Sequence, residues 1–364
     1  MIKIRKEFRH PVLQMMGISR LRVPSRNWLI FWGVTGTLVG SYYLDRRQRQ
    51  LIRESYIKQV EYLGKQTLQP LGGFQKVKVY VAPPPNDFLD PSLSEFRNYI
   101  KPILNAAAID HELITEERQG YIRSTIAEEI RQLRKSQNEN SDINPTGESN
   151  EDNNREYTGT LIIGRGAFKE YINGIQEGWL GPIERPAEVQ EKVDAAAAVE
   201  KERLKKRHEK NAEDTEGKDQ MKYDTEKEYE EDKLATLHRK YPVVPAYINA
   251  KDLSEAELPE LFESTPQMPI QVYRLPHLLG ILSVPTRIYR WLNERYLADE
   301  IGQQTVNVIF NKKRPFELKD ADLAKSDEED WPNKFKQNGI DSNSEWMQDL
   351  VVDPRIAKHL EVFE

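Results

Sequence analysis

The chain has 364 residues, 38% hydrophobic and 31% charged, an ordinary balance for one large or two smaller globular domains. Cysteine is absent, which excludes a disulfide scaffold, a thiolate zinc site, an iron–sulfur cluster and a cysteine nucleophile. Residues 1–27 carry a net charge of +6, which leaves −12 for residues 28–364 out of the total of −6, and so acidic a body argues against a nucleic-acid binder.

The basic arm, residues 1–27, is followed by a stretch that favours a membrane span. Residues 28–44 are seventeen residues without a charge, and as a helix they would extend about 25 Å, near the lower limit for one crossing. Tryptophans stand near its start and tyrosines at its end, where amphipathic rings prefer the lipid headgroups. The pattern favours a single transmembrane helix over a buried core helix. An arginine-rich arm before it is typical of mitochondrial targeting.

Small residues line part of this predicted helix. Gly36 and Gly40 are four residues apart, and Gly33 lies on a neighbouring face. Small residues let helix backbones approach closely in lipid, so the pattern predicts a docking face for another membrane protein. The alternative is that glycine is simply common in membrane helices. Basic residues flank both ends of the segment, so the positive-inside rule gives only a small preference for the N-terminus on the more negative side.

Beyond a connecting segment, residues 45–75, the sequence alternates predicted strands and helices as far as residue 185. Strands are predicted at 76–82, 111–115 and 158–163. Helices are predicted from Asp90, with a bend at Pro102, over 122–133, and after Gly166. This order implies an α/β fold with a mainly parallel sheet covered by helices. Residues 137–157 are a polar, flexible insert.

Residues 186–240 form a second insert, dense in charge and nearly free of β-branched residues, which predicts a solvated helix or disorder outside the core. Residues 241–364 return to apolar periodicity and predict a smaller, mixed α+β region. Strands are expected at 270–273 and 305–310, and helices at 286–297 and 354–360.

The turn Gly164-Arg165-Gly166 joins a predicted strand to a predicted helix. Such glycine-rich turns can cradle phosphate at a helix N-terminus, although a tight turn alone explains the same residues. The six histidines include no i, i+4 pair, so the sequence predicts no metal site of the HExxH type and, overall, no cofactor.

The order and spacing of VYVAPPPNDF, EERQGYIRSTIAEEIRQLR and TLIIGRGAFKEYINGI resemble the nucleotide-binding domain of diacylglycerol and sphingosine kinases. In that resemblance the family's asparagine falls on Ala82, Pro83 is kept, its aspartate falls on Arg165 and its threonine on Ala167. Gly164 and Gly166 match. Phosphoryl transfer depends on metal ions and their ligands, and an arginine cannot hold Mg²⁺. The resemblance therefore implies a kinase-like fold with vestigial phosphate loops and no activity.

Blocks along nearly the whole chain, including RLRVPSRNWLIFWGV, GRGAFKEYINGIQEGWLGPIE and SEWMQDLVVDPRIAKHLEVFE, are similar to the Tim54 family of fungi. This resemblance implies a non-enzymatic scaffold subunit of the carrier translocase in the mitochondrial inner membrane. It implies a matrix-facing N-terminus, one span, and a body in the intermembrane space. The implied partners are the pore-forming subunit of the translocase and the small intermembrane-space chaperones that deliver carrier precursors.

A helix near Thr286 is the candidate contact surface of the body. Arg287, Arg290 and Arg295 alternate with aromatic residues, including Trp291. These residues predict a face for anionic lipid or an acidic partner; the alternative is an ordinary amphipathic helix with basic solvent residues. Two other functions stay open for the whole chain, an active membrane-tethered lipid kinase and an adaptor of another inner-membrane assembly such as an AAA protease.

Overall fold

The computed structural model describes residues 25–65, 76–115, 119–140, 157–187, 189, 191, 246–248, 253, 256–341 and 344–364, with the backbone of 7–8 and 21–22. Nearly all of the predicted insert 186–240 and most of the insert 137–157 lie outside these residues. Most of the basic arm does too, apart from two short strands, β1 (Glu7–Phe8) and β2 (Leu21–Arg22), which pair antiparallel.

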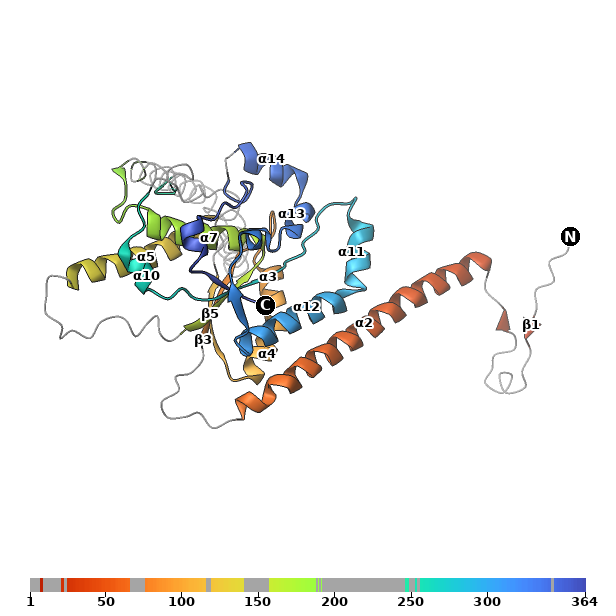
Figure 1. The fold of residues 1–364 in the computed structure, drawn as a ribbon. Coiled ribbons are helices and arrows are strands. Elements are labelled where there is room, and N and C mark those ends of the chain that lie inside the picture. Colours follow the sequence, from red (N-terminus) through yellow and green to blue (C-terminus); the bar gives the residue numbers. More distant parts are fainter. Residues whose placement is uncertain are drawn as a thin grey trace, which may run out of the picture.

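A six-stranded sheet forms the centre of the fold, in the order β4-β3-β5-β6-β8-β7 (Figure 1). The strands are β3 (Lys76–Val81), β4 (Asp110–Thr115), β5 (Tyr157–Ile163), β6 (Ile270–Tyr273), β7 (Lys313–Pro315) and β8 (Glu361–Phe363). All neighbouring pairs are parallel except β7 with β8. The prediction of an α/β fold with a mainly parallel sheet is confirmed. Strands from 76–185 and from 241–364 share this one sheet.

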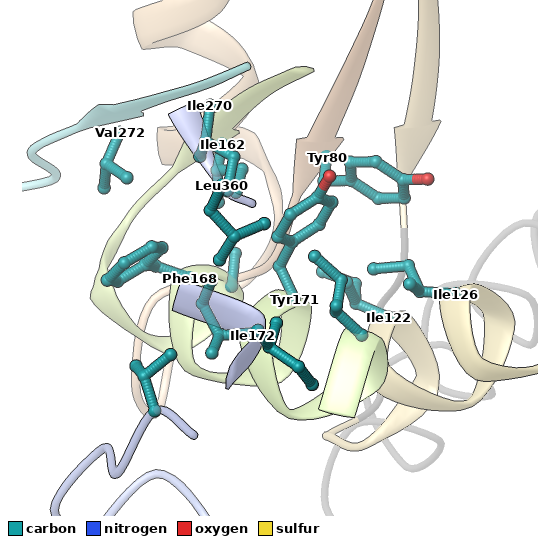
Figure 2. Close-up of a cluster of buried hydrophobic side chains, with 14 of the residues drawn as sticks. Tyr80, Ile122, Ile126, Ile162, Phe168, Tyr171, Ile172, Ile270, Val272 and Leu360 are labelled. Carbon is teal, nitrogen blue, oxygen red and sulfur yellow. The ribbon is translucent and has the colours of Figure 1, made fainter. Parts of the chain in front are cut away.

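One face of the sheet is covered by α5 (Tyr121–Asn140) and α7 (Arg165–Leu180). Tyr80, Ile162 and Ile270 point from their strands toward Phe168 and Ile172 of α7 (Figure 2). Side chains alternate along each strand, so the neighbouring residues point to the other face. The central strands β3, β5 and β6 are buried along nearly their whole length, so both faces of the sheet are covered there.

The opposite face packs against α2 (Arg26–Gly64), α4 (Lys101–Ala106) and α12 (Glu294–Ile309). Val79 and Leu161 of the sheet meet Ile103 of α4, Ile301 of α12 and Val60 of α2 in one buried cluster. The C-terminal half of α2 is thus part of the core. Its N-terminal half extends away from the body (Figure 1).

The predicted helix from Asp90 is built in three pieces, α3 (Asp90–Glu95), a π-helical turn η1 (Phe96–Ile100) and α4. Asp90 lies inside the helix, and Leu89 is the residue at its N-cap. The π turn stands directly before Pro102, which has no N–H to donate to the preceding turn, so the irregularity occurs close to the predicted bend.

One prediction in the C-terminal part was wrong, and two others were right only in part. Residues 305–310 continue α12 instead of forming a strand, because Ile301, Thr305 and Ile309 recur at helical spacing and are buried against the sheet. The helix predicted over 286–297 is two helices, α11 (Val284–Trp291) and α12, with a break at Leu292 and Asn293. The last predicted helix ends early as α15 (Pro354–Ala357).

The sequence interpretation missed several elements. These are β7, β8 and the short helices α10 (Glu260–Ser264), η3 (Leu318–Asp322), α13 (Ser326–Asp330) and α14 (Asn333–Asp341).

The predicted transmembrane helix is not supported. No helix in the described part of the chain combines the length and the apolar character that a crossing requires. Residues 28–44 lie near the beginning of the 39-residue helix α2. Three glycines, two threonines and a serine lower the mean hydropathy of this uncharged run.

Candidate functional site

The two predicted phosphate loops lie side by side in the structure. The strand order reverses direction between β3 and β5, and in open α/β sheets ligands bind outside the carboxyl ends of the strands at such a point. Ala82 and Pro83 follow β3, while Gly164, Arg165 and Gly166 follow β5, and both turns line one small crevice. The structure thus brings together the residues of the two loops that the kinase resemblance names.

The crevice is closed, because residues from the C-terminal part of the chain fill it. Only about 10 Å³ remains among its lining residues, room for about one water molecule. Trp331, Trp346 and Asp327 complete the lining. A nucleotide would have to displace these side chains to reach the turns.

Arg165 is turned into the protein, with 3% of its surface exposed. Its Nε lies 2.7 Å from a carboxylate oxygen of Glu328, and its Nη1 donates to the backbone carbonyls of Ala321 at 2.5 Å and Leu323 at 2.9 Å. Lys169, one turn further along α7, lies 2.8 Å from the same Glu328 carboxylate. Arg165 thus ties α7 to the segment 321–328.

The ionisation of these groups follows their burial. Burial raises the pKa of Asp327 to about 6, although its carboxylate accepts a hydrogen bond from the Leu275 N–H at 2.9 Å. Burial tends to raise the pKa of Glu328, but hydrogen bonds from Arg165 and Lys169 outweigh it and hold that pKa below the usual range. The Glu328 carboxylate is therefore paired with two cationic side chains of the same chain, Arg165 and Lys169. Within the described residues no group of three acidic or histidine side chains could hold a metal ion.

The backbone conformation and the packing of the second turn require its two glycines. Gly164 has a φ of +89°, a conformation that side chains with a Cβ rarely adopt. A Cβ on Gly166 would come within 2.6 Å of the Trp346 ring, so only glycine allows this contact. The Trp346 Nε1–H donates at 2.6 Å to Glu170, whose pKa burial raises to about 8. The turn that could cradle phosphate instead admits a tryptophan.

A second candidate surface is the N-terminal half of α2. Its apolar side chains are exposed on all sides of the helix, at Trp28, Leu29, Ile30, Phe31, Trp32, Val34, Leu38, Val39, Tyr43 and Leu44. Gly33, Gly36 and Gly40 have no atom of another element within 4 Å of where a Cβ would stand. The predicted helix-packing residues are therefore open to a partner.

The place where α2 joins the body is marked by an ionic cluster around one buried carboxylate. Asp45, the first charged residue after the uncharged run, has no exposed surface. Its carboxylate lies 3.0 Å from Arg49 Nε and 3.7 Å from Arg295 Nη1, and Arg49 also pairs with Glu294. Nearby, the Tyr42 ring stacks on the Trp291 ring with centroids 4.4 Å apart. These contacts fix α2 against the α11–α12 junction.

The four predicted surface residues of this region have different environments. Arg290 forms a two-bond ion pair with Asp330, Arg295 reaches Asp45, and Trp291 covers Tyr42, whereas Arg287 is exposed. A cavity of about 620 Å³ lies beside them, lined mainly by residues of α11, α12 and the loop before α11.

Glu95 borders this cavity, and burial raises its pKa to about 8, with a further contribution from Glu294. Sequence reasoning named the arginines but missed Asp45 and Glu95. The position of Asp45 at the end of the uncharged run was the available signal for the first of these.

The comparisons with known proteins all point to one family, and the matches extend over nearly the whole chain. The family described as "Inner membrane protein import complex subunit Tim54" matches residues 10–363. The chain belongs to the Tim54 family. A relative from Candida albicans, named mitochondrial import inner membrane translocase subunit TIM54, is 35% identical over 100% of this chain and 98% of its own length. The relatives with this name from Saccharomyces cerevisiae and Aspergillus oryzae are 30% and 33% identical, over 98% and 94% of this chain and 94% and 84% of theirs.

Proposed function

We propose that this chain is a non-enzymatic scaffold subunit of the mitochondrial inner-membrane translocase that inserts carrier proteins. The observation that carries the proposal is the match to the Tim54 family over residues 10–363, together with relatives that are each named as a mitochondrial import inner membrane translocase subunit. Nothing in this role requires a reaction at the sheet edge.

The closed crevice supports the non-enzymatic part of the proposal. Phosphoryl transfer needs a bound nucleotide, metal ions and their acidic ligands, all positioned together. Here Arg165 stands where the kinase resemblance places an acidic residue, is paired with Glu328, and lies in a crevice that keeps about 10 Å³. The purified full chain is expected to give no ATP-dependent phosphorylation of diacylglycerol or sphingosine. Measurable product would favour the lipid-kinase alternative instead.

We further propose that the exposed apolar half of α2 attaches the chain to the inner membrane, with the body in the intermembrane space. Ten large apolar side chains between Trp28 and Leu44 are exposed, a larger apolar surface than soluble monomers usually carry. In mitochondria, the body is expected to become protease-sensitive once the outer membrane is ruptured, and the chain to stay with the membrane fraction in high salt. A body that remains protected would contradict this location.

Partner contacts are proposed at the open glycines of α2, for the pore-forming subunit, while the body receives the small chaperones. Affinity purification of the tagged chain in mild detergent, followed by mass spectrometry, is expected to recover the translocase subunits. The Gly36→Leu, Gly40→Leu double variant is expected to lose the pore-forming subunit, whereas Val34→Leu, an exposed apolar change in the same half of the helix, is not. Recovery of an AAA protease without translocase subunits would favour the adaptor alternative.

A further inference from the structure

The loop before α11 exposes two neighbouring aliphatic side chains almost completely. Ile281 is 89% exposed and Leu282 is 98% exposed. Gly280, with a φ of +103°, turns the chain immediately before them, and the Ser283 hydroxyl bonds back to the Gly280 carbonyl at 2.8 Å. Single exposed aliphatics are common on proteins, but an adjacent pair at a loop tip marks a surface that meets something apolar.

The helix that follows the tip continues this apolar surface. In α11, Val284, Ile288 and Tyr289 are exposed, and none of its residues is buried. The exposed Arg287 lies among them, while Arg290 faces Asp330 of the body. An amphipathic helix with an aromatic and aliphatic face beside a free arginine is typical of helices that lie in a membrane interface.

The position of α11 is set by α2. The Trp291 and Tyr42 rings stack at the C-terminal end of α11. Arg295, just beyond, donates its backbone N–H to Asp45 at 3.3 Å. Tyr42 and Asp45 mark the point on α2 where the uncharged run ends and charge begins. In Figure 1, α11 stands beside the middle of α2, and the loop before it leads away from α12.

We propose that the tip Leu278–Leu282 and the exposed face of α11 insert into the headgroup region of an anionic lipid bilayer. The inference rests on the proposed membrane attachment of α2 and adds a second contact to it. Lipid fits better than a protein partner because exposed aromatic rings flank the stacked pair of Tyr42 and Trp291 along the chain, at Tyr43 on α2, Tyr289 on α11 and Tyr296 on α12. Such rings prefer the membrane interface.

Exposed arginines close in sequence to these rings favour an anionic bilayer in particular. Arg46 and Arg47 are exposed on α2, one turn beyond Tyr42 and Tyr43, and Arg287 is exposed on α11. Basic residues near a membrane surface are attracted to acidic headgroups within a Debye length. With α2 and the tip both in contact with lipid, the sheet would be held in one orientation relative to the membrane.

The absence of cysteine makes a direct test possible. Single cysteines placed by Leu282→Cys, Val39→Cys and Val351→Cys in the full chain are labelled with an environment-sensitive fluorophore. All three positions are exposed in the structure, and Val351 lies on the body as the matched control. Each labelled chain is reconstituted in phosphatidylcholine vesicles with or without phosphatidylglycerol, and quenching by lipid-attached nitroxides is measured.

The label at Leu282 is expected to shift to the blue and to be quenched by shallow nitroxides, while the label at Val351 stays unquenched. Arg287→Ala is expected to lower the inserted fraction of the tip about fivefold in vesicles with phosphatidylglycerol and to leave it unchanged without. Quenching at Val39 but not at Leu282 would overturn the tip contact and leave the attachment by α2 intact. Absence of quenching at Val39 would instead contradict the proposed attachment itself.

Discussion

Arg165→Asp is the most direct test of the closed crevice, because it restores the acidic residue of the kinase pattern and removes the closing interaction. Arg165 contributes one ion pair, to Glu328, and two hydrogen bonds to backbone carbonyls. Removing one partner of a buried pair costs about 3–5 kcal/mol, and an aspartate here would also face the Glu328 carboxylate. That loss is a large part of the 5–15 kcal/mol that typically stabilises a domain.

The expected result is a fall in melting temperature of about 10 °C and a lower midpoint of urea unfolding. Unfolding is monitored by tryptophan fluorescence, to which Trp331 and Trp346 at the crevice contribute. Arg165→Lys keeps the charge but cannot reach two carbonyls, and it should lose less. Arg97→Asp, at an exposed position, should stay within about 0.5 kcal/mol of the parent chain. If Arg165→Asp unfolds like the parent chain, or gains ATP-dependent phosphorylation, the reasoning about the crevice is refuted.

Three further outcomes concern the junction of α2 with the body. Burial raises the pKa of Glu95 from 4.5 to about 8. The protonated Glu95 therefore makes its full contribution to the free energy of unfolding below pH 4.5, and this contribution is lost as the pH rises toward 8. Glu95→Gln should remove this fall, a gain of about 2–4 kcal/mol in urea unfolding above pH 8, and none in acid. Asp45→Ala removes the buried carboxylate that Arg49 and Arg295 share, while Arg49 keeps its ion pair with Glu294, so thermal unfolding should show a loss of about 1–3 kcal/mol. A Cβ at Gly302 would come within 2.4 Å of the Tyr56 ring, so Gly302→Leu should cost about 1–3 kcal/mol, and Tyr56→Ala in the same chain should recover part of it in a double-mutant cycle.

Local pattern was enough to predict the central strands. The predicted bounds of β3, β4, β5 and β6 agree with the structure to within one or two residues, because short stretches with β-branched or apolar residues, bounded by turn residues, favour strands. Residues 305–310 carry the same β-branched composition and yet are helical. Their apolar positions also fit a helix, and burial between the sheet and α2 decided between the two.

The contents of the crevice could not be predicted in this way. The turns after β3 and β5 are local features, and their meeting follows from the topology of a parallel sheet. The residues that close the crevice come from more than 150 positions further along the chain, as the contact of Arg165 with Glu328 shows. No periodicity links Gly166 to Trp346. A departure from a motif, such as Arg165, indicates lost chemistry, but only the fold shows what replaced it.

The distribution of glycine along α2 explains how one helix can serve both a partner and the body. The helix has 39 residues, about 58 Å at the usual rise, and its glycines occur at positions 33, 36, 40 and, at its last residue, 64. Between residues 41 and 63 it has neither glycine nor proline, the residues at which helices most often bend. That stretch includes Tyr42, Asp45 and Val60, which fix the helix to α11, α12 and the sheet. The exposed half therefore holds the residues at which α2 bends most easily, and the partner proposed at these glycines would be linked to the core of the body by a stretch of helix that lacks such residues.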